Sequence, residues 1–137
     1  MISNNSQGII RLFLILLLAI AGIGASADSG AKCHPLPLKP IDSEDIAIAT
    51  AKEAVQVYKL TSLTNECLNF EASTSPTKSG YVINVREKHS SECGGNPMVE
   101  PRLFSFQVSP TGKLMTDAYT TDMKFEPLSC KRKALGY

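Results

Sequence analysis

The sequence predicts an α+β fold in which one N-terminal helix packs on a four-stranded antiparallel meander sheet and two disulfides hold the chain. Three observations support this fold class. One stretch of apolar residues has the period of a helix, several later stretches alternate apolar and polar residues, and four cysteines follow an apparent export signal. A helix covering one face of an antiparallel sheet lets both elements bury their apolar sides.

Residues 1–27 have the pattern of a secretory signal peptide. The start is polar, every residue from 12 to 21 is apolar, and Ala25-Ser26-Ala27 forms an A-x-A cleavage site. The alternative is a membrane anchor, which needs about 20 apolar residues. The shorter run favours cleavage near Ala27, a secreted or periplasmic location and no membrane span afterwards. We expect 28–41 to be a Pro-rich N-terminal arm and 42–137 a single α+β domain.

The charge balance excludes several classes of partner. The chain has 137 residues and a formal net charge of +1, with Arg11 the only charged residue in the signal segment. The other 13 Lys and Arg residues therefore balance 13 Asp and Glu residues. Without a basic stripe, neither nucleic acid nor an acidic membrane surface is an expected partner. The sequence also has no phosphate-binding loop or other cofactor motif, so we expect another protein as the partner and no cofactor.

The cysteines at positions 33, 67, 93 and 130 predict a disulfide framework. An even number of cysteines in a small exported chain is typical of disulfides, and four allow three pairings. Zinc is the alternative, because His34 and His89 lie near two of the cysteines. No C-x-x-C or H-x-x-x-H spacing occurs, however, so no metal site is expected. The two histidines are interpreted as surface or packing residues.

A helix is predicted over residues 43–60. Asp42 or Ser43 is the expected cap, and the acidic residues that follow suit the positive end of the helix dipole. The predicted buried face consists of Ile48, Ala51, Val55 and Tyr58.

Alternating stretches predict strands at 68–72, 81–88, 104–108 and about 113–119, with a tight Pro-Gly turn before the last. The polar side chains of the middle strands are expected to form an open face without a large apolar patch. In a meander, the start of the first strand lies beside the end of the second. Of the three possible pairings, this favours Cys67 with Cys93, which leaves Cys33 for Cys130.

Residues 81–85 are Tyr-Val-Ile-Asn-Val, residues 104–108 are Phe-Ser-Phe-Gln-Val, and residues 111–114 are Thr-Gly-Lys-Leu. After an alanine-rich helix, this order resembles the PepSY-like modules of exported bacterial proteins, which pair a Y-x-V-x-V strand with a V-D-x-x-T-G-K hairpin. The chain departs from that pattern at Pro110, where an acidic residue is frequent, and in a cysteine-containing loop within the central hairpin. The resemblance covers about 43–117 and implies a small binding or inhibitory module without catalytic residues.

The loop 89–101 is the predicted binding site. Long irregular loops in compact domains are often functional, and a disulfide at Cys93 would order this one before binding. The alternative is a connection that packs over one end of the sheet with Met98 in the core. The residues expected to contact a partner are Asn96, Pro97, Met98, Val99 and Glu100.

The preferred hypothesis is a non-catalytic inhibitor or immunity-type protein that binds an extracytoplasmic enzyme. A second hypothesis is a structural or accessory domain of an envelope complex. A third is a thiol enzyme that uses Cys93 with His89, which requires a free thiolate and a base within reach. Four cysteines in an oxidising compartment weigh against the third, so no catalytic residue is assigned.

Overall fold

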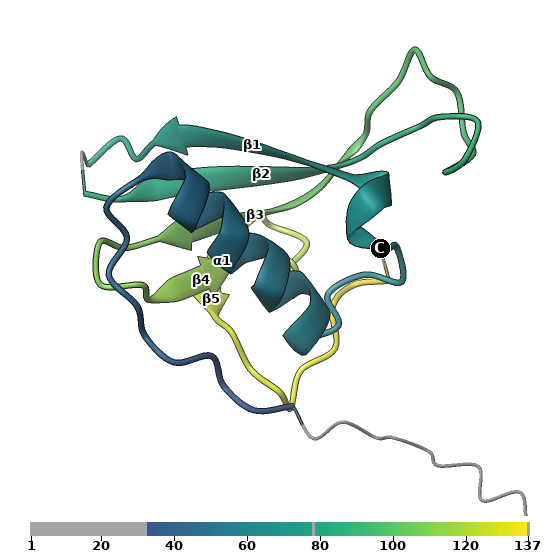
Figure 1. Ribbon diagram of the computed structural model, residues 1–137. Coiled ribbons are helices and arrows are strands. Elements are labelled where there is room, and N and C mark those ends of the chain that lie inside the picture. Colours follow the sequence, from purple (N-terminus) through teal and green to yellow (C-terminus); the bar gives the residue numbers. More distant parts are fainter. Residues whose placement is uncertain (1–32, 78, 137) are drawn as a thin grey trace, which may run out of the picture. The chain divides into compact units, whose positions relative to one another are not determined.

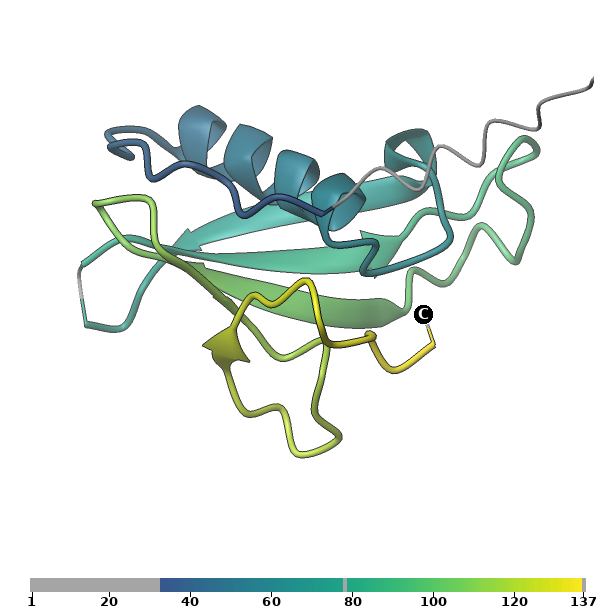
Figure 2. The same ribbon diagram turned by 90° about the horizontal axis from the view of Figure 1, so that it is seen from below.

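The computed structural model describes residues 33–77 and 79–136, in which one helix covers one face of an antiparallel sheet (Figures 1 and 2). The predicted signal peptide and residues 28–32 lie outside the described residues. The elements are α1 (Glu44–Val57), a 3-10 turn η1 (Asn65–Cys67), β1 (Leu68–Thr74), β2 (Tyr81–Glu87), β3 (Arg102–Val108), β4 (Leu114–Thr116) and β5 (Glu126–Pro127). The sheet order β1-β2-β3-β4-β5 is a meander.

The α+β class is confirmed, but two details of the prediction are wrong. The sheet has five strands instead of four, and the helix is not N-terminal because an extended arm from Cys33 precedes it. The predicted last strand stops after Thr116, and β5 has only two residues. One of these is Pro127, which has no amide to donate, so no alternating pattern could mark this strand.

Ser43 caps α1, because its side chain accepts a hydrogen bond from the backbone N–H of Ile46 (3.3 Å). The helix ends at Val57, three residues earlier than predicted. Its buried residues are Ala47, Ala51, Ala54 and Val55, whereas the predicted face residues Ile48 and Tyr58 are only half-buried. Alanine has no side chain beyond Cβ, so the helix axis can lie close to the sheet.

The core lies between α1 and the facing side chains of β2 and β3. Ile83 and Val85 of β2 and Phe104 and Phe106 of β3 are fully buried. The two phenylalanine rings pack edge to face with centroids 5.7 Å apart. These four residues belong to the alternating patterns that predicted the strands, so their burial explains the patterns.

The opposite face of β3 is less open than predicted, because Ser105 is only 2% exposed. Its backbone N–H donates to Asp117 Oδ1 (2.6 Å), and its hydroxyl donates to Asn84 Oδ1 (2.7 Å). Arg102 hydrogen-bonds to both Ser105 and Asp117. The Asp117 carboxylate therefore replaces a backbone carbonyl as the acceptor for the Ser105 N–H just where β4 ends, while the N–H of Asp117 still donates to the carbonyl of Ser105 (3.3 Å).

The two disulfides are the pairs that the strand order favoured, Cys67–Cys93 and Cys33–Cys130, each with Cα atoms 5.5 Å apart. In Figure 1 the N-terminal arm and the yellow C-terminal segment converge, and the second bridge joins them. In the part of the chain that is described, no helix is long and apolar enough to cross a membrane. Two disulfides are typical of proteins in an oxidising compartment.

Candidate functional site

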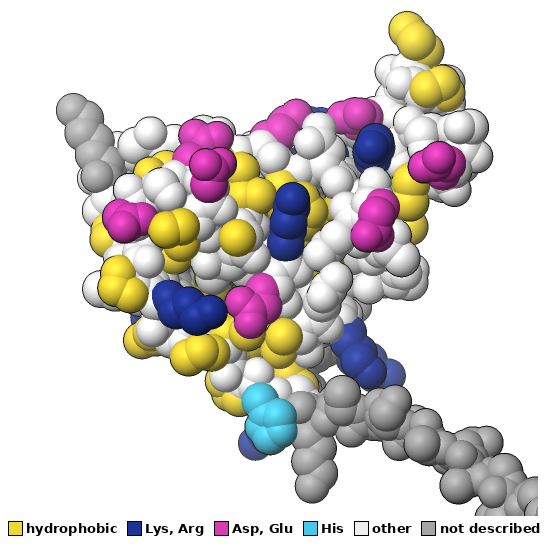
Figure 3. All heavy atoms as spheres, viewed as in Figure 1, with side chains coloured by type: hydrophobic (Ala, Val, Ile, Leu, Met, Phe, Trp, Pro, Cys, Tyr) yellow, Lys and Arg dark blue, Asp and Glu magenta, His cyan; other side chains and the backbone are white. Residues whose placement is uncertain are grey.

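Residues 88–101 form a loop that projects beyond the sheet between β2 and β3 (Figure 1). Met98 is 88% exposed and Val99 is 51% exposed. Figure 3 shows apolar side chains at the end of this projection, at the upper right. The loop therefore does not pack over the sheet with Met98 in the core, which was the alternative considered from the sequence.

The base of the loop is joined to the fold on both sides. The Cys67–Cys93 disulfide links it to the turn before β1, and the N–H of Lys88 donates to the carbonyl of Cys67 (2.8 Å). On the other side, the N–H of Glu87 donates to the carbonyl of Pro101 (2.9 Å). These contacts extend the pairing of the two strands into the loop, so its base is fixed by the sheet and by a covalent bond.

The first limb of the loop folds on itself through Ser90. The backbones of Ser90 and Gly94 exchange two hydrogen bonds, of 3.2 and 2.8 Å. The Ser90 hydroxyl also accepts from the N–H groups of Glu92 and Cys93. The cysteine is thus held by backbone geometry as well as by its bridge.

His89 ties the two limbs of the loop together. Its Nδ1 lies 2.9 Å from the carbonyl oxygen of Asn96, and its Nε2 lies 3.3 Å from Oε1 of Glu87. Gly95 packs directly against the ring: a Cβ at this position would lie 2.5 Å from the imidazole. The φ of Gly95 is also +80°, a conformation that other residues rarely adopt. His89 is therefore a packing residue of the loop, and Gly95 provides the space for it.

Asn96 forms the turn that presents the tip. Its side-chain oxygen accepts from the N–H of Met98 (3.0 Å), and its carbonyl accepts from the N–H of Val99 (3.0 Å). An Asn side chain that bonds to the backbone two residues further on mimics a backbone turn. The apolar side chains of Met98 and Val99 follow this turn directly, so their backbone is ordered while their side chains face solvent.

Glu100 belongs to the far limb of the loop. Its carboxylate accepts a hydrogen bond from Asn69 Nδ2 (3.2 Å), and its carbonyl accepts from Arg86 Nη1 (3.1 Å). The five predicted contact residues therefore fall into two groups, those that are only exposed and those that also support the loop. Met98, Val99 and Pro97 are exposed at the tip, whereas Asn96 and Glu100 also have partners that support the loop. Sequence reasoning did not identify Asn69 or Glu87 as supports, because in the sequence they are ordinary strand residues.

Acidic groups gather around the base of the loop. Glu66, beside the disulfide, has its pKa lowered by a hydrogen bond to its own backbone N–H and by the side chain of Thr64. Glu87, Glu92 and Glu100 lie within or next to the loop. The apolar tip therefore stands on a loop whose base is rich in acidic side chains.

The arrangement around Cys93 bears on the thiol-enzyme hypothesis. Cys93 is bonded to Cys67, so in this state its sulfur is not a nucleophile. The nitrogen atoms of His89 face Asn96 and Glu87 instead. Within residues 33–77 and 79–136, no three His, Cys, Asp or Glu side chains form a group that could hold a metal ion.

Comparison with known proteins gives no relative to set beside this geometry: no family model, curated protein or solved structure matches the chain.

Proposed function

We propose that this chain is an exported protein-binding domain, an inhibitor or immunity-type protein whose loop 88–101 enters a cleft of an extracytoplasmic enzyme. The observation that carries the proposal is the exposure of Met98, at 88%, on a loop whose backbone is already ordered. A flexible loop loses conformational entropy when it binds, and an ordered loop avoids much of that loss.

The chemistry of the tip favours a partner with an apolar pocket. Met98 is long, unbranched and polarisable, so it can fill a pocket of irregular shape. Val99 adds a rigid apolar surface beside it. Protein interfaces are enriched in Met and surround an apolar centre with a polar rim, and Glu100, which directly follows the two apolar residues, can belong to such a rim. The order of helix, strands and Thr-Gly-Lys hairpin on which the PepSY-like resemblance rests also supports a binding role.

The open face of the sheet provides less support for the accessory-domain hypothesis. Glu71 and Arg86 form an ion pair there (3.0 Å), and the Ser105 hydroxyl is already hydrogen-bonded to Asn84. A face with internally paired polar groups offers a partner few unsatisfied groups and little apolar area. The projecting tip is the stronger candidate.

The test compares two exposed methionines. The purified protein, Met98→Asp and Met123→Asp are immobilised and exposed to envelope and culture-medium extracts of the producing cells. Met123 is 65% exposed on a different loop, so its substitution makes the same change in charge away from the tip. We expect an enzyme that the parent protein captures and inhibits. Met98→Asp should weaken binding by about 30-fold or more, as for an interface hot spot, and Met123→Asp should bind normally. Equal capture and inhibition by both variants would contradict the proposal.

A further inference from the structure

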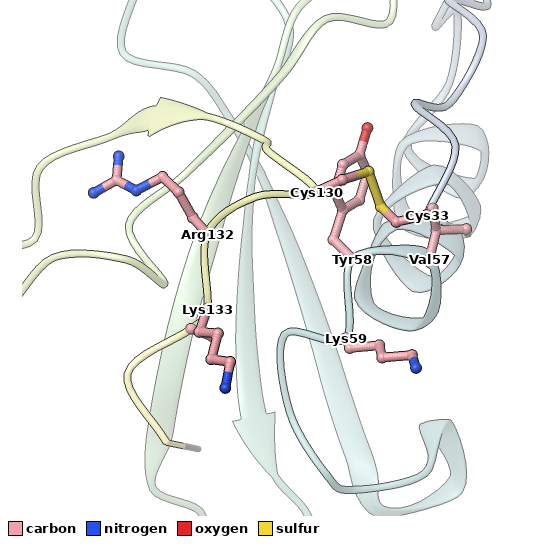
Figure 4. Close-up of a pocket in the computed structure, with 8 residues that line it drawn as sticks. Cys33, Val57, Tyr58, Lys59, Cys130, Arg132 and Lys133 are labelled. Carbon is pink, nitrogen blue, oxygen red and sulfur yellow. A yellow bond between two sulfur atoms is a disulfide. The ribbon is translucent and has the colours of Figure 1, made fainter. Parts of the chain in front are cut away.

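A second site lies away from the loop, at the end of α1. A pocket of about 430 Å³ opens between the C-terminal end of the helix and the C-terminal segment of the chain (Figure 4). Its volume is within the range of small-molecule sites. It is lined by Cys33, Val57, Tyr58, Lys59, Cys130, Arg132, Lys133 and Ala134.

The lining combines an apolar interior with positive charge. Val57, the ring of Tyr58, Ala134 and the Cys33–Cys130 disulfide supply apolar surface, and none of the residues that line the pocket is acidic. Three lining residues are basic. The guanidinium of Arg132 pairs with Glu126 and lies over the ring of Tyr119, so its charge is already engaged.

The ammonium groups of Lys59 and Lys133 carry the free positive charge. Figure 4 shows the two side chains on opposite sides of the gap between the helix end and the C-terminal segment, with the Lys59 ammonium turned away from Lys133. Within the described ranges, neither ammonium group has a carboxylate within ion-pair distance. Flexible lysine side chains can turn toward a bound anion without losing an existing partner.

Lys59 occupies an unusual backbone position. The N–H of Leu60 donates to the carbonyl of Val55 and the N–H of Lys59 donates to the carbonyl of Gln56, which is the Schellman pattern of a helix end. The residue in this place is left-handed and is usually glycine, yet here it is a lysine with φ +50°. Non-glycine residues in this conformation are strained and tend to cluster at functional sites. The same hydrogen bonds engage the carbonyls of Val55 and Gln56.

We propose that this pocket binds a small organic carboxylate with an apolar body, of the type of a medium-chain fatty acid. The apolar body would lie against Tyr58, Val57 and the disulfide, and the carboxylate would lie between Lys59 and Lys133. A small inorganic anion would gain nothing from the apolar walls, and a neutral apolar molecule would gain nothing from the lysines. The proposal is independent of the loop 88–101.

The test uses octanoate as the probe, with 1-octanol, octylammonium and acetate as comparisons. Binding is followed through NMR shifts of the backbone amides of the whole protein. We expect saturable octanoate binding that shifts the amides of Tyr58, Lys59 and Ala134. Acetate, octanol and octylammonium should each bind at least about tenfold more weakly, because each lacks one of the two required features.

Matched variants separate this site from general electrostatic attraction. Lys133→Ala should weaken octanoate binding about threefold, the value of one partly exposed charge contact. Lys131→Ala removes the same charge from a neighbouring residue that does not line the pocket, and should have no effect. Lys59→Gly should weaken octanoate binding and raise the melting temperature, because glycine relieves the left-handed strain. Equal binding of octanol and octanoate, equal effects at positions 131 and 133, or no saturable shift would each overturn the proposal.

Discussion

One disulfide of this protein supports a projecting loop, and the other lies beside a pocket. Cys67–Cys93 closes 26 residues of chain and supports a loop that projects into solvent. Cys33–Cys130 closes 97 residues and joins the arm and the C-terminal segment beside a pocket. The first bridge orders a segment that has little core beneath it, and the second holds segments whose other contacts reach the core. The same kind of bond therefore supports a convex surface at the loop and a concave surface at the pocket.

The largest difference between the two regions is expected in stability. The double substitution Cys33→Ser with Cys130→Ser should lower the free energy of unfolding by about 4–5 kcal/mol, because a longer closed loop restricts the unfolded chain more. The C-terminal segment should also lose its contact with the arm. Urea denaturation of the purified variant measures the change. A loss smaller than that caused by removing the other bridge would break the comparison.

Removing Cys67 and Cys93 should lower the stability of the whole fold less than removing the other bridge, but should loosen the loop 88–101 more. We expect a loss of about 3–4 kcal/mol in the free energy of unfolding, since this bridge closes a shorter loop. Hydrogen exchange of the amides in residues 89–99 should become much faster, whereas exchange in α1 should change little below the unfolding transition. If loop exchange stayed slow, the hydrogen bonds of Ser90 and His89 alone would be sufficient to order the loop.

A pair of glycine substitutions tests how the loop is held. Gly94 and Gly95 both have positive φ, of +77° and +80°, so alanine is strained at either position. A Cβ at 95 would also meet the ring of His89, whereas a Cβ at 94 would meet nothing within 4 Å. Gly95→Ala should therefore destabilise the protein by about 1–3 kcal/mol and displace His89, and Gly94→Ala by less. Urea denaturation and the NMR signals of the His89 ring compare them, and identical results would show that the ring contact is unimportant.

The smallest expected change in the free energy of unfolding comes from a hydrogen-bonded tyrosine next to the C-terminal segment that borders the pocket. The Tyr119 hydroxyl donates to the carbonyl of Ser129 and accepts from its N–H, both at 3.2 Å. Tyr119→Phe should lower the free energy of unfolding by about 1–2 kcal/mol through the lost hydrogen bonds. Tyr81→Phe is the control, because the Tyr81 hydroxyl is not hydrogen-bonded within the described part of the chain.

Tyr119 also gives this region a dependence on pH. Burial raises its pKa above the ordinary value of 10.0, although the hydrogen bond to Ser129 acts in the other direction. The folded protein thus favours the neutral phenol. The resulting stability is present below pH 10.0 and is lost as the pH rises through the raised pKa. Urea midpoints should fall at alkaline pH in the parent protein and less in Tyr119→Phe, and parallel curves would contradict this assignment.

The loop and the pocket also differ in how well the sequence predicts them. The loop is contiguous in sequence, and its cysteine, paired glycines and prolines all lie between two alternating segments, so its position and several of its residues could be predicted. The pocket combines Cys33, Lys59 and Lys133, which are distant in sequence and have no common motif. Only the folded chain brings them together.

The predictable parts of the fold are those that are buried against the core along their length. The periodic patterns of α1, β2 and β3 reflect burial against a continuous core, so they are visible in the sequence. The short strand β5 and the burial of Ser105 depend on single contacts, such as the hydrogen bond from the Ser105 N–H to the Asp117 carboxylate. Contacts of this kind leave no repeated pattern. The disulfide pairing could be inferred because it depends on strand order, which the strong patterns determine.

The nesting of the two bridges has a consequence for how the chain matures. A ribosome produces Cys33, Cys67 and Cys93 before Cys130, so oxidation in order of appearance would join the first two cysteines and give the wrong pair. The register that places Leu68 opposite Glu87 brings Cys67 toward Cys93 as soon as the β1–β2 hairpin forms. The inner bridge therefore needs only this local hairpin, whereas the outer bridge needs the N-terminal arm and the C-terminal segment to be brought together by the folded chain.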